Sequence, residues 1–323
     1  MSRQPDLHVV FGTGPAGLTL ADELRARGHR VRLVNRKGKI SEPLPEGVEL
    51  VAGDAAKLSA VCELSAGAAT IYNCTHAPYE SWPEVLPRLQ ENMIEGAAAT
   101  GAKLVVIDTL YLYGPTGGQP MNEGMAHLAT SRKGRLRAEL AWGYLQAHRA
   151  GKARVAIGRA ADFFGPRVTN SALGQFAFPA ALEGGPMVAF GNVDLPHSYS
   201  FMPDVARGLA TLGERDEVLG RDWLLPVSPA RTTREVAGLM GEAIGRPVQL
   251  VALPDMDAVA SLGVLDLTFL AEYDELFYQY SEPQIVDSSA ITRELGVYAT
   301  PMPEAIAATV RWYQALLAPV GQM

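Results

Sequence analysis

The chain has 323 residues, of which 48% are hydrophobic and 20% charged, a composition typical of a globular enzyme with a sizeable core. Its formal charge of −7 disfavours nucleic acids and anionic membranes as partners. Because no apolar run is long enough to span a membrane or to act as a signal sequence, and only two cysteines are present, we expect a reduced, cytoplasmic protein. We predict no metal site.

The glycine-rich turn near the N-terminus is the strongest motif. We assign residues 7–11 to a strand, 18–27 to a helix that ends at Gly28, and 31–36 to a second strand. Between strand and helix, a G-x-G-x-x-G match is typical of dinucleotide binding. Gly12 permits a tight turn, Gly14 leaves room for the pyrophosphate, and Gly17 allows close helix packing. The helix N-terminus favours the phosphates. We predict that six residues contact the cofactor: Gly12, Thr13, Gly14, Pro15, Ala16 and Gly17.

The end of the second strand bears on the choice of dinucleotide. NAD sites usually place an acidic residue there to bind the ribose 2′-hydroxyl, whereas an arginine accommodates the 2′-phosphate of NADP. This chain has Asn35 and Arg36 followed by Lys37 and Lys39, and no acid. Arginine can bind a phosphate through two parallel hydrogen bonds. We therefore favour NADP(H) over NAD(H), with Asn35 and Arg36 as cofactor residues; the alternative is a solvated basic turn.

Strands and helices alternate through the first half of the chain. The expected strands are residues 48–54, 69–74, 103–109 and 153–159, and the expected helices begin near residues 83 and 131. After Pro166 the alternation breaks, and a helix near residue 202 and a strand at 223–226 follow. This alternation predicts an α/β fold with a doubly wound parallel sheet and a smaller C-terminal α+β substrate-binding region. We expect a dinucleotide-binding domain over residues 1–166 and a substrate-binding cap over 167–323, with residues 200–226 returning to the first domain.

Polar or small residues follow several of these strands. Ligands bind at the carboxyl ends of strands in such sheets, so we expect further cofactor contacts there. For Asp54, the cap of a helix N-terminus is an equally good interpretation. The residues concerned are Asp54, Ala55, Asn73, Cys74, Thr75 and Ala160.

Taken together, these motifs resemble an extended or atypical short-chain dehydrogenase/reductase of the NAD-dependent epimerase/dehydratase family. The resemblance covers nearly the whole chain and implies a Rossmann fold and a nicotinamide cofactor. Besides the glycine turn, it is carried by Gly53-Asp54, Thr109 to Gly114, Gly158 to Pro166, Tyr199 to Ala206, Ile285 to Ser289 and Glu294-Leu295-Gly296.

The chain departs from the family at its catalytic pair, Tyr-x-x-x-Lys. Lys133 matches the lysine, but Ala129 stands where the tyrosine belongs. The resemblance implies that Lys133 holds the nicotinamide ribose and that Thr109 holds the substrate oxygen. Three explanations remain open: another phenol replaces the tyrosine, the reaction needs no strong acid, or the chain binds NADP(H) as a sensor without catalysis.

Tyr111 is the phenol that we expect to be catalytic, beside Thr109 and Lys133. If the strand continued past Thr109, its alternation would place Tyr111 and Tyr113 on the same side as Thr109. Tyr79 is a more distant candidate for the same role, and Tyr113 could instead be structural. Predicted substrate contacts are Tyr79, Tyr113, Phe163 and His197.

Several basic residues surround Lys133. We expect Arg135 and Arg137 at the surface, whereas Arg132 could approach a phosphate or carboxylate of the substrate. A homodimer through two long helices is usual for the resembled family. The candidate apolar faces could equally pack within the chain; they are Leu86, Leu89 and Met93 on one helix and Leu136, Leu140 and Leu145 on the other.

The sequence thus predicts an NADP(H)-dependent oxidoreductase. It would move a hydride between the nicotinamide and a carbonyl, alcohol or activated double bond of a small substrate. The first alternative is an NAD(P)-dependent epimerase or dehydratase acting on a sugar or sugar nucleotide. The second alternative is a non-catalytic NADP(H)-binding sensor.

Overall fold

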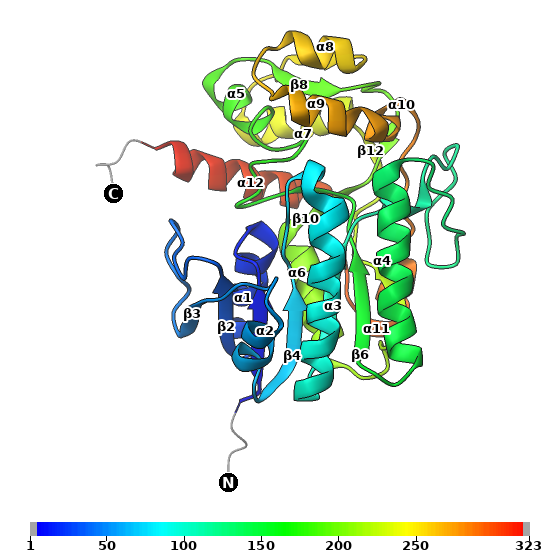
Figure 1. The fold of residues 1–323 in the computed structure, drawn as a ribbon. Helices are drawn as coiled ribbons and strands as arrows, with labels where there is room; N and C mark the ends of the chain where they lie inside the picture. Colours follow the sequence, from blue (N-terminus) through cyan, green and yellow to red (C-terminus); the bar gives the residue numbers. More distant parts are fainter. Residues whose placement is uncertain (1–4, 319–323) are drawn as a thin grey trace.

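One sheet of seven strands, in which every neighbouring pair runs parallel, organises the chain. The computed structural model describes residues 5–318 (Figure 1). The strands lie in the order β3-β2-β1-β4-β5-β6-β11. They are β1 (Leu7–Phe11), β2 (Arg30–Asn35), β3 (Val48–Ala52), β4 (Ala68–Asn73), β5 (Lys103–Asp108), β6 (Arg154–Arg159) and β11 (Asp222–Leu224). The predicted doubly wound parallel sheet is confirmed.

Helices cover both faces of the sheet, because its central strands are apolar on both sides. In β1, Val9 and Phe11 join the core on one face, whereas Val10 joins the core on the other. The first face carries α2 (Leu58–Leu64), α3 (Trp82–Thr100) and α4 (Arg132–Arg149). The second carries α1 (Pro15–Ala26), α6 (Met202–Glu214) and α11 (Ser289–Leu295).

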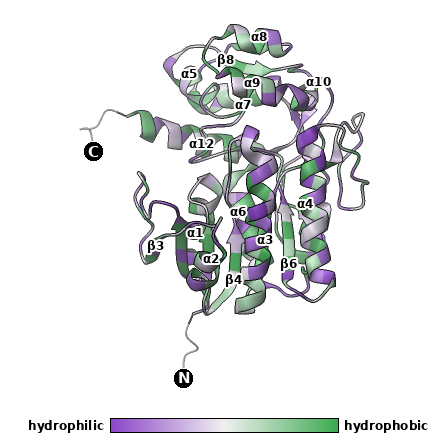
Figure 2. Ribbon diagram, viewed as in Figure 1, coloured by the Kyte–Doolittle hydropathy of each residue, from purple (hydrophilic) through white to green (hydrophobic). Residues whose placement is uncertain are grey.

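Helices α3 and α4 alternate hydrophilic and hydrophobic residues along their length (Figure 2). Their apolar side chains pack inside the chain, because Leu86, Leu89, Met93 and Leu140 are all buried in one core cluster. Leu136 and Leu145 are partly buried against the same cluster. Of the two interpretations given above for these faces, packing within the chain is therefore the one that the structure shows.

The C-terminal region lies above the sheet in Figure 1 and builds a core of its own. There, Phe178 stacks on Tyr313 with ring centroids 5.2 Å apart. Its helices are α5 (Phe178–Glu183), α7 (Thr233–Ile244), α8 (Met256–Ser261), α9 (Leu267–Tyr273), α10 (Tyr278–Ser281) and α12 (Met302–Leu317). Its paired strands are β7 (Asp162–Phe164) with β10 (Tyr199–Phe201), β8 (Met187–Phe190) with β13 (Leu250–Leu253), and β9 (Pro196–His197) with β12 (Arg231–Thr232).

The chain returns from this region to the sheet twice. First, α6 packs on α1 and β11 pairs with β6. Later, Ile291 and Leu295 of α11 join the same core, a second return that the predicted domain division did not include. The division itself stays a prediction. Among the described helices, none combines the length and apolar character that crossing a bilayer requires.

His8 is a buried ionisable residue near the start of β1. It is 2% exposed, its Nδ1 lies 2.9 Å from the Tyr72 hydroxyl oxygen, and its ring is 4.1 Å from that of His29. Burial, together with the nearby His29, lowers the pKa of His8 to about 3. The native protein therefore keeps this imidazole neutral at pH values where the unfolded chain would protonate it.

We expect stability to fall as the pH drops below about 6.5, the usual pKa of histidine. Below that pH the unfolded chain binds a proton at His8, whereas His8 of the native state stays unprotonated down to about pH 3. This residue alone should remove about 1.4 kcal/mol of unfolding free energy per pH unit in that window. Urea unfolding of wild type and His8→Gln between pH 7 and 4 measures the difference. Equal pH slopes in the two proteins would contradict the assignment.

Candidate active site

The glycine turn between β1 and α1 combines two closely packed glycines with one that faces open space. Gly12 has φ +110°, and a Cβ there would lie 2.2 Å from the carbonyl oxygen of Cys74. A Cβ on Gly17 would lie 2.0 Å from the carbonyl oxygen of Gly12. At Gly14, by contrast, a Cβ would meet no atom within 4 Å. Two glycines are thus required for close packing, and the middle one faces open space.

The N-terminus of α1 adjoins that open space. Gly14 is its N-cap, so no side chain caps the helix, and Pro15 occupies the first turn, where its missing N–H costs nothing. The remaining N–H groups of the first turn and the positive end of the helix dipole favour an anion. The turn therefore fits the phosphates of a dinucleotide.

The basic turn after β2 is shaped by Asn35. Its amide nitrogen donates to Thr13 Oγ1 at 2.8 Å and to the Lys39 carbonyl at 2.9 Å. Its amide oxygen accepts from the backbone N–H groups of Lys37 and Gly38. The Asn35 amide is thus used within the turn, whereas the neighbouring Arg36 is exposed. Asn35 therefore joins the basic turn to the glycine turn.

The predicted residues after β3 also make internal contacts. Asp54 Oδ1 accepts from the N–H of Ala56 at 3.0 Å, a local turn rather than the helix cap that we weighed. Ala55 is 8% exposed, and its carbonyl accepts from Asn92.

The residues after β4 and β6 are likewise held within the chain. Asn73 donates to the Tyr144 hydroxyl at 3.1 Å and accepts from the hydroxyl of Thr75 at 2.6 Å. Cys74 is buried, and this burial raises the pKa of its thiol to about 12, so it is an unreactive thiol. The N–H of the buried Ala160 donates to the Asp108 carbonyl.

Beyond β5 the chain turns into a 3₁₀ helix, η2 (Tyr111–Tyr113), rather than continuing as a strand. The expectation that Thr109, Tyr111 and Tyr113 lie on one side is therefore wrong, because strand alternation ends at Asp108. Tyr113 is 1% exposed and packs in a core cluster with Leu112. Its burial makes it a core residue in this conformation, rather than a side chain open to substrate.

Tyr111 forms a hydrogen-bonded pair with Tyr79 of η1 (Tyr79–Ser81). Their hydroxyl oxygens are 2.9 Å apart, and either can donate. Trp82 stacks on Tyr111 with ring centroids 6.2 Å apart, and the two rings of Tyr79 and Trp82 are 4.8 Å apart. Burial raises the pKa of both phenols, so both keep their protons at neutral pH. The two predicted phenols form one pair.

Lys133 lies in the first turn of α4, which Ser131 caps by accepting from the N–H of Gly134. The lysine is 3% exposed, and its Nζ is 5.3 Å from the ring centroid of Tyr79. Nζ donates to Glu275 Oε1 at 2.8 Å and also to Glu272. Both glutamates come from the C-terminal region. Lys133 is thus brought to the tyrosine pair, with carboxylate partners that we did not predict.

Ala129 lies close to two glycines. A Cβ on Gly134 would lie 2.6 Å from the Ala129 Cβ, and one on Gly114 would lie 2.9 Å from the Ala129 Cα. The backbone N–H of Ala129 donates to the Leu112 carbonyl. The family's tyrosine position is therefore packed against backbone, and the nearest phenols come from other segments.

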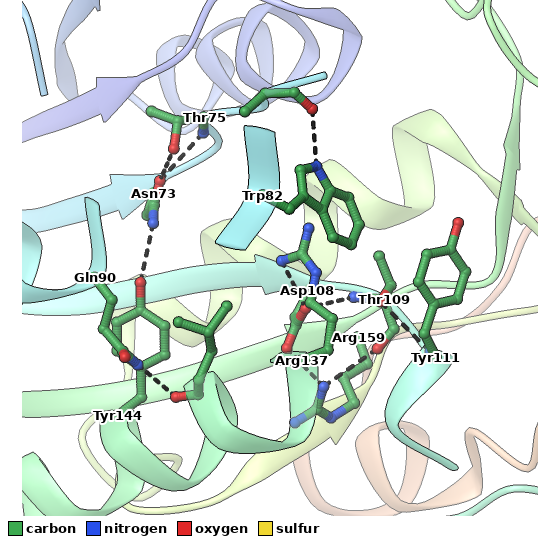
Figure 3. A network of polar contacts seen from close by, with 12 residues as sticks. Asn73, Thr75, Trp82, Gln90, Asp108, Thr109, Tyr111, Arg137, Tyr144 and Arg159 are labelled. Carbon is green, nitrogen blue, oxygen red and sulfur yellow. Dashed lines mark hydrogen bonds and ion pairs between the residues drawn. The ribbon is translucent and has the colours of Figure 1, made fainter. Parts of the chain in front are cut away.

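Figure 3 shows a network of polar contacts beside Trp82 and Tyr111, in which Asp108 joins Arg137 and Arg159. Arg159 donates to Asp108 Oδ2 at 2.7 Å and to Asp222 Oδ2 at 2.8 Å, and its Nη1 also reaches the Thr109 carbonyl at 3.2 Å. Arg137 donates to Asp108 Oδ1 at 3.0 Å, with its guanidinium carbon 4.1 Å from the Trp82 ring centroid. The expected surface position of Arg137 is therefore wrong, because Asp108 and Trp82 together draw its guanidinium inward.

The predicted substrate residue His197 belongs to a second polar cluster. Its Nε2 lies 3.0 Å from Asp162 Oδ2, which also accepts from the Tyr280 hydroxyl at 3.0 Å. The Tyr280 hydroxyl lies 2.8 Å from that of Tyr273. Phe163, next to Asp162, is partly buried against the core on the face of the sheet that carries α1 and α6. Asp162, Tyr273 and Tyr280 were not predicted.

The density of acidic and aromatic residues in positions 272–280 is the signal that would have singled this segment out. Phe269 and Tyr273 bring it to Tyr79, with ring centroids 6.0 and 6.1 Å away. The carboxyl edge of the sheet thus gathers protonated phenols, a buried ammonium group and carboxylates. Such a set can hold a polar substrate atom and exchange a proton with it.

Several solved structures with a similar fold are epimerases or dehydratases. The epimerase Mth375 from Methanothermobacter thermautotrophicus is 18% identical, with a TM-score of 0.79, covering 97% of this chain and 93% of that one. UDP-glucose 4-epimerase from Thermotoga maritima is 17% identical, with a TM-score of 0.77 and coverage of 97% and 100%. The dTDP-glucose 4,6-dehydratase DesIV from Streptomyces venezuelae, solved with NAD, is 18% identical, with a TM-score of 0.73 and coverage of 96% and 97%.

At identities this low, the TM-scores show a shared fold. No curated protein matches the sequence. Residues 9–224, more than half of the chain, match the family of NAD-dependent epimerases and dehydratases, in agreement with the resemblance drawn from the motifs. The chain therefore belongs to the NAD-dependent epimerase/dehydratase family.

Proposed function

We propose that this chain is a nicotinamide-dinucleotide-dependent enzyme of the epimerase or dehydratase type, acting on a hydroxyl-bearing carbon of a sugar or sugar nucleotide. The observation that carries the proposal is the open space at Gly14 beside the uncapped N-terminus of α1. Family membership, and neighbours such as UDP-glucose 4-epimerase and dTDP-glucose 4,6-dehydratase, support this reaction type.

Arg36 favours a second candidate, an NADP(H)-dependent oxidoreductase with net hydride transfer to or from a carbonyl, alcohol or activated double bond. This guanidinium is exposed at the end of β2, where an acidic residue would repel a 2′-phosphate. Cytoplasmic localisation and a homodimer stay predictions under both candidates.

In either reaction the bound dinucleotide would supply a hydride acceptor or donor at its nicotinamide ring. The glycine turn would hold the pyrophosphate, and Lys133 the nicotinamide ribose. Thr109 would orient the substrate oxygen. In this conformation, the carbonyl of Thr109 accepts from the buried Arg159, which holds the backbone of this residue in place.

The Tyr79–Tyr111 pair would take the role of the missing tyrosine. Tyr111 would exchange the substrate's hydroxyl proton, and Tyr79, hydrogen-bonded to it, would share the charge that develops on its oxygen. The ammonium group of Lys133, 5.3 Å from the Tyr79 ring centroid, would favour that negative charge.

Gly14→Val should fold as wild type does and lose both dinucleotides. The extended backbone at Gly14, with φ −78° and ψ −174°, accepts a branched residue, and its Cβ would enter space that no protein atom fills. Thermal unfolding and fluorescence titration with NADH and NADPH measure the two effects. As a contrast, Gly12→Ala should destabilise the fold by more than about 1 kcal/mol, given its φ of +110°. Unchanged binding by Gly14→Val would refute the proposed cofactor site.

Arg36→Ala should weaken NADPH binding about tenfold, or about 1.4 kcal/mol, and leave NADH binding unchanged. The reason is that only NADPH carries the phosphate that this guanidinium would bind. Lys39→Ala, in the same exposed turn, is the control for a general loss of positive charge. If wild type binds NADH as well as NADPH, Arg36 has no part in selection and the epimerase or dehydratase candidate gains.

Tyr111→Phe should lower kcat about a hundredfold with dinucleotide affinity unchanged, because a positioned proton donor contributes about that much. Turnover is measured on UDP-glucose and on a panel of small carbonyl compounds with either dinucleotide. Tyr113→Phe is the matched control, since its buried hydroxyl has no hydrogen-bond partner within the described residues. Equal loss in both variants would point to packing instead of proton transfer. Bound cofactor without turnover by wild type would favour the sensor.

A further inference from the structure

The C-terminal segment of residues 256–281, here called the cap segment, contacts the predicted active site directly. It comprises α8, α9, the 3₁₀ helix η3 (Asp274–Leu276) and α10. In Figure 1, α9 lies above the upper ends of α3 and α4. The cap segment's Phe269 and Tyr273 pack on Tyr79, the partner of the proposed proton donor.

Two carboxylates of the cap segment hold Lys133. Glu275 Oε1 accepts from its Nζ at 2.8 Å, and Glu272 accepts from the same nitrogen. The Lys133 side chain is 4% exposed and each glutamate side chain 19% exposed, so water is largely excluded from the contact. The ammonium group that would hold the nicotinamide ribose is therefore engaged by protein carboxylates.

Glu275 also docks on the N-terminus of α4. Its Oε2 accepts from the backbone N–H of Arg132 at 2.6 Å, next to the helix cap provided by Ser131. The side chain of Arg132 approaches Glu272 at 3.4 Å and Glu275 at 3.7 Å. A negative charge at this end of a helix is stabilised by the helix dipole. The contact thus joins the cap segment to the nucleotide-binding region through charge, not only through packing.

The charges of this contact are matched. The hydrogen bond that Glu272 accepts from Lys133 lowers the pKa of Glu272. Burial opposes ionisation of Glu275, but hydrogen bonds from Lys133 and Arg132 outweigh it and lower its pKa as well. Both carboxylates are therefore charged at neutral pH. A cation partly removed from water does not give up such partners without a replacement.

We propose that the cap segment is a latch that competes with the dinucleotide for Lys133. For Lys133 to bind the nicotinamide ribose, its ammonium group must exchange the carboxylates of Glu272 and Glu275 for ribose oxygens. Dinucleotide binding then loosens the cap segment and opens the substrate site beneath it, and an engaged cap segment weakens dinucleotide binding by the same factor. This inference rests on the proposed function, since it assumes a dinucleotide at Lys133.

Removing the charge of either carboxylate should therefore strengthen dinucleotide binding. We expect Glu272→Gln and Glu275→Gln each to bind NADPH or NADH at least about fivefold more tightly than wild type, the lower end of typical coupling between sites. A purely structural role for these glutamates predicts the reverse, namely weaker binding. Asp274→Asn is the matched control, because it removes the same charge from an exposed position between them.

Hydrogen exchange on the unaltered protein is the second measurement and does not depend on whether a variant folds. With saturating dinucleotide, backbone amides of residues 267–276 should exchange faster, whereas those of the central strands should not. Slower exchange in the cap segment on addition of dinucleotide would overturn the latch and indicate a lid that closes on the cofactor.

The outcomes separate the latch from the proposed function. Tighter binding by the two glutamine variants and unchanged binding by Asp274→Asn support the latch, and binding only by the glutamine variants supports it most strongly. If wild type binds a dinucleotide and the glutamine variants bind it equally or more weakly, the latch is wrong and the proposed function stands. If no protein of the set binds either dinucleotide, both are wrong.

Discussion

The buried guanidinium of Arg159 is the constraint on which the candidate site depends. Its side chain has no exposed surface, so its charge must be balanced inside the protein, and Asp108 and Asp222 balance it at 2.7 and 2.8 Å. These residues end or begin three adjacent strands, β5, β6 and β11. Moving the guanidinium away from either carboxylate would leave a buried charge unpaired. The two ion pairs therefore hold these strand ends together.

From that ion network the constraint extends to both helices that frame the site. Asp108 holds Arg137 of α4, and Arg137 in turn lies over the ring of Trp82 at the start of α3. Trp82 packs on Tyr79 and on Tyr111. The paired phenols come from two separate 3₁₀ helices, η1 and η2, and are held together by this packing above the ion network. This is a different construction from the family's Tyr-x-x-x-Lys, in which one helix carries both groups.

Lys133 connects the tyrosine pair to the C-terminal region. It lies at the start of α4, close to Tyr79, yet its partners Glu272 and Glu275 come from more than a hundred residues later in the chain. In the proposed function this lysine would have two sets of partners, carboxylates of the protein and hydroxyls of a cofactor. The latch that we propose would couple the affinity for one set to the affinity for the other.

The sequence by itself determined the parts of this protein that are local. Periods of apolar residues set the strands and helices, and the glycine turn follows from steric limits at Gly12 and Gly17. The turn of the chain after Asp108 escaped prediction, because alternation says nothing about where a strand stops. Only the tertiary structure decided that Arg137 turns inward, that Tyr111 pairs with Tyr79, and that Glu272 and Glu275 reach Lys133. The physical reason is that such contacts join residues distant in sequence, whose charges and rings find one another only once the sheet has placed the strand ends together.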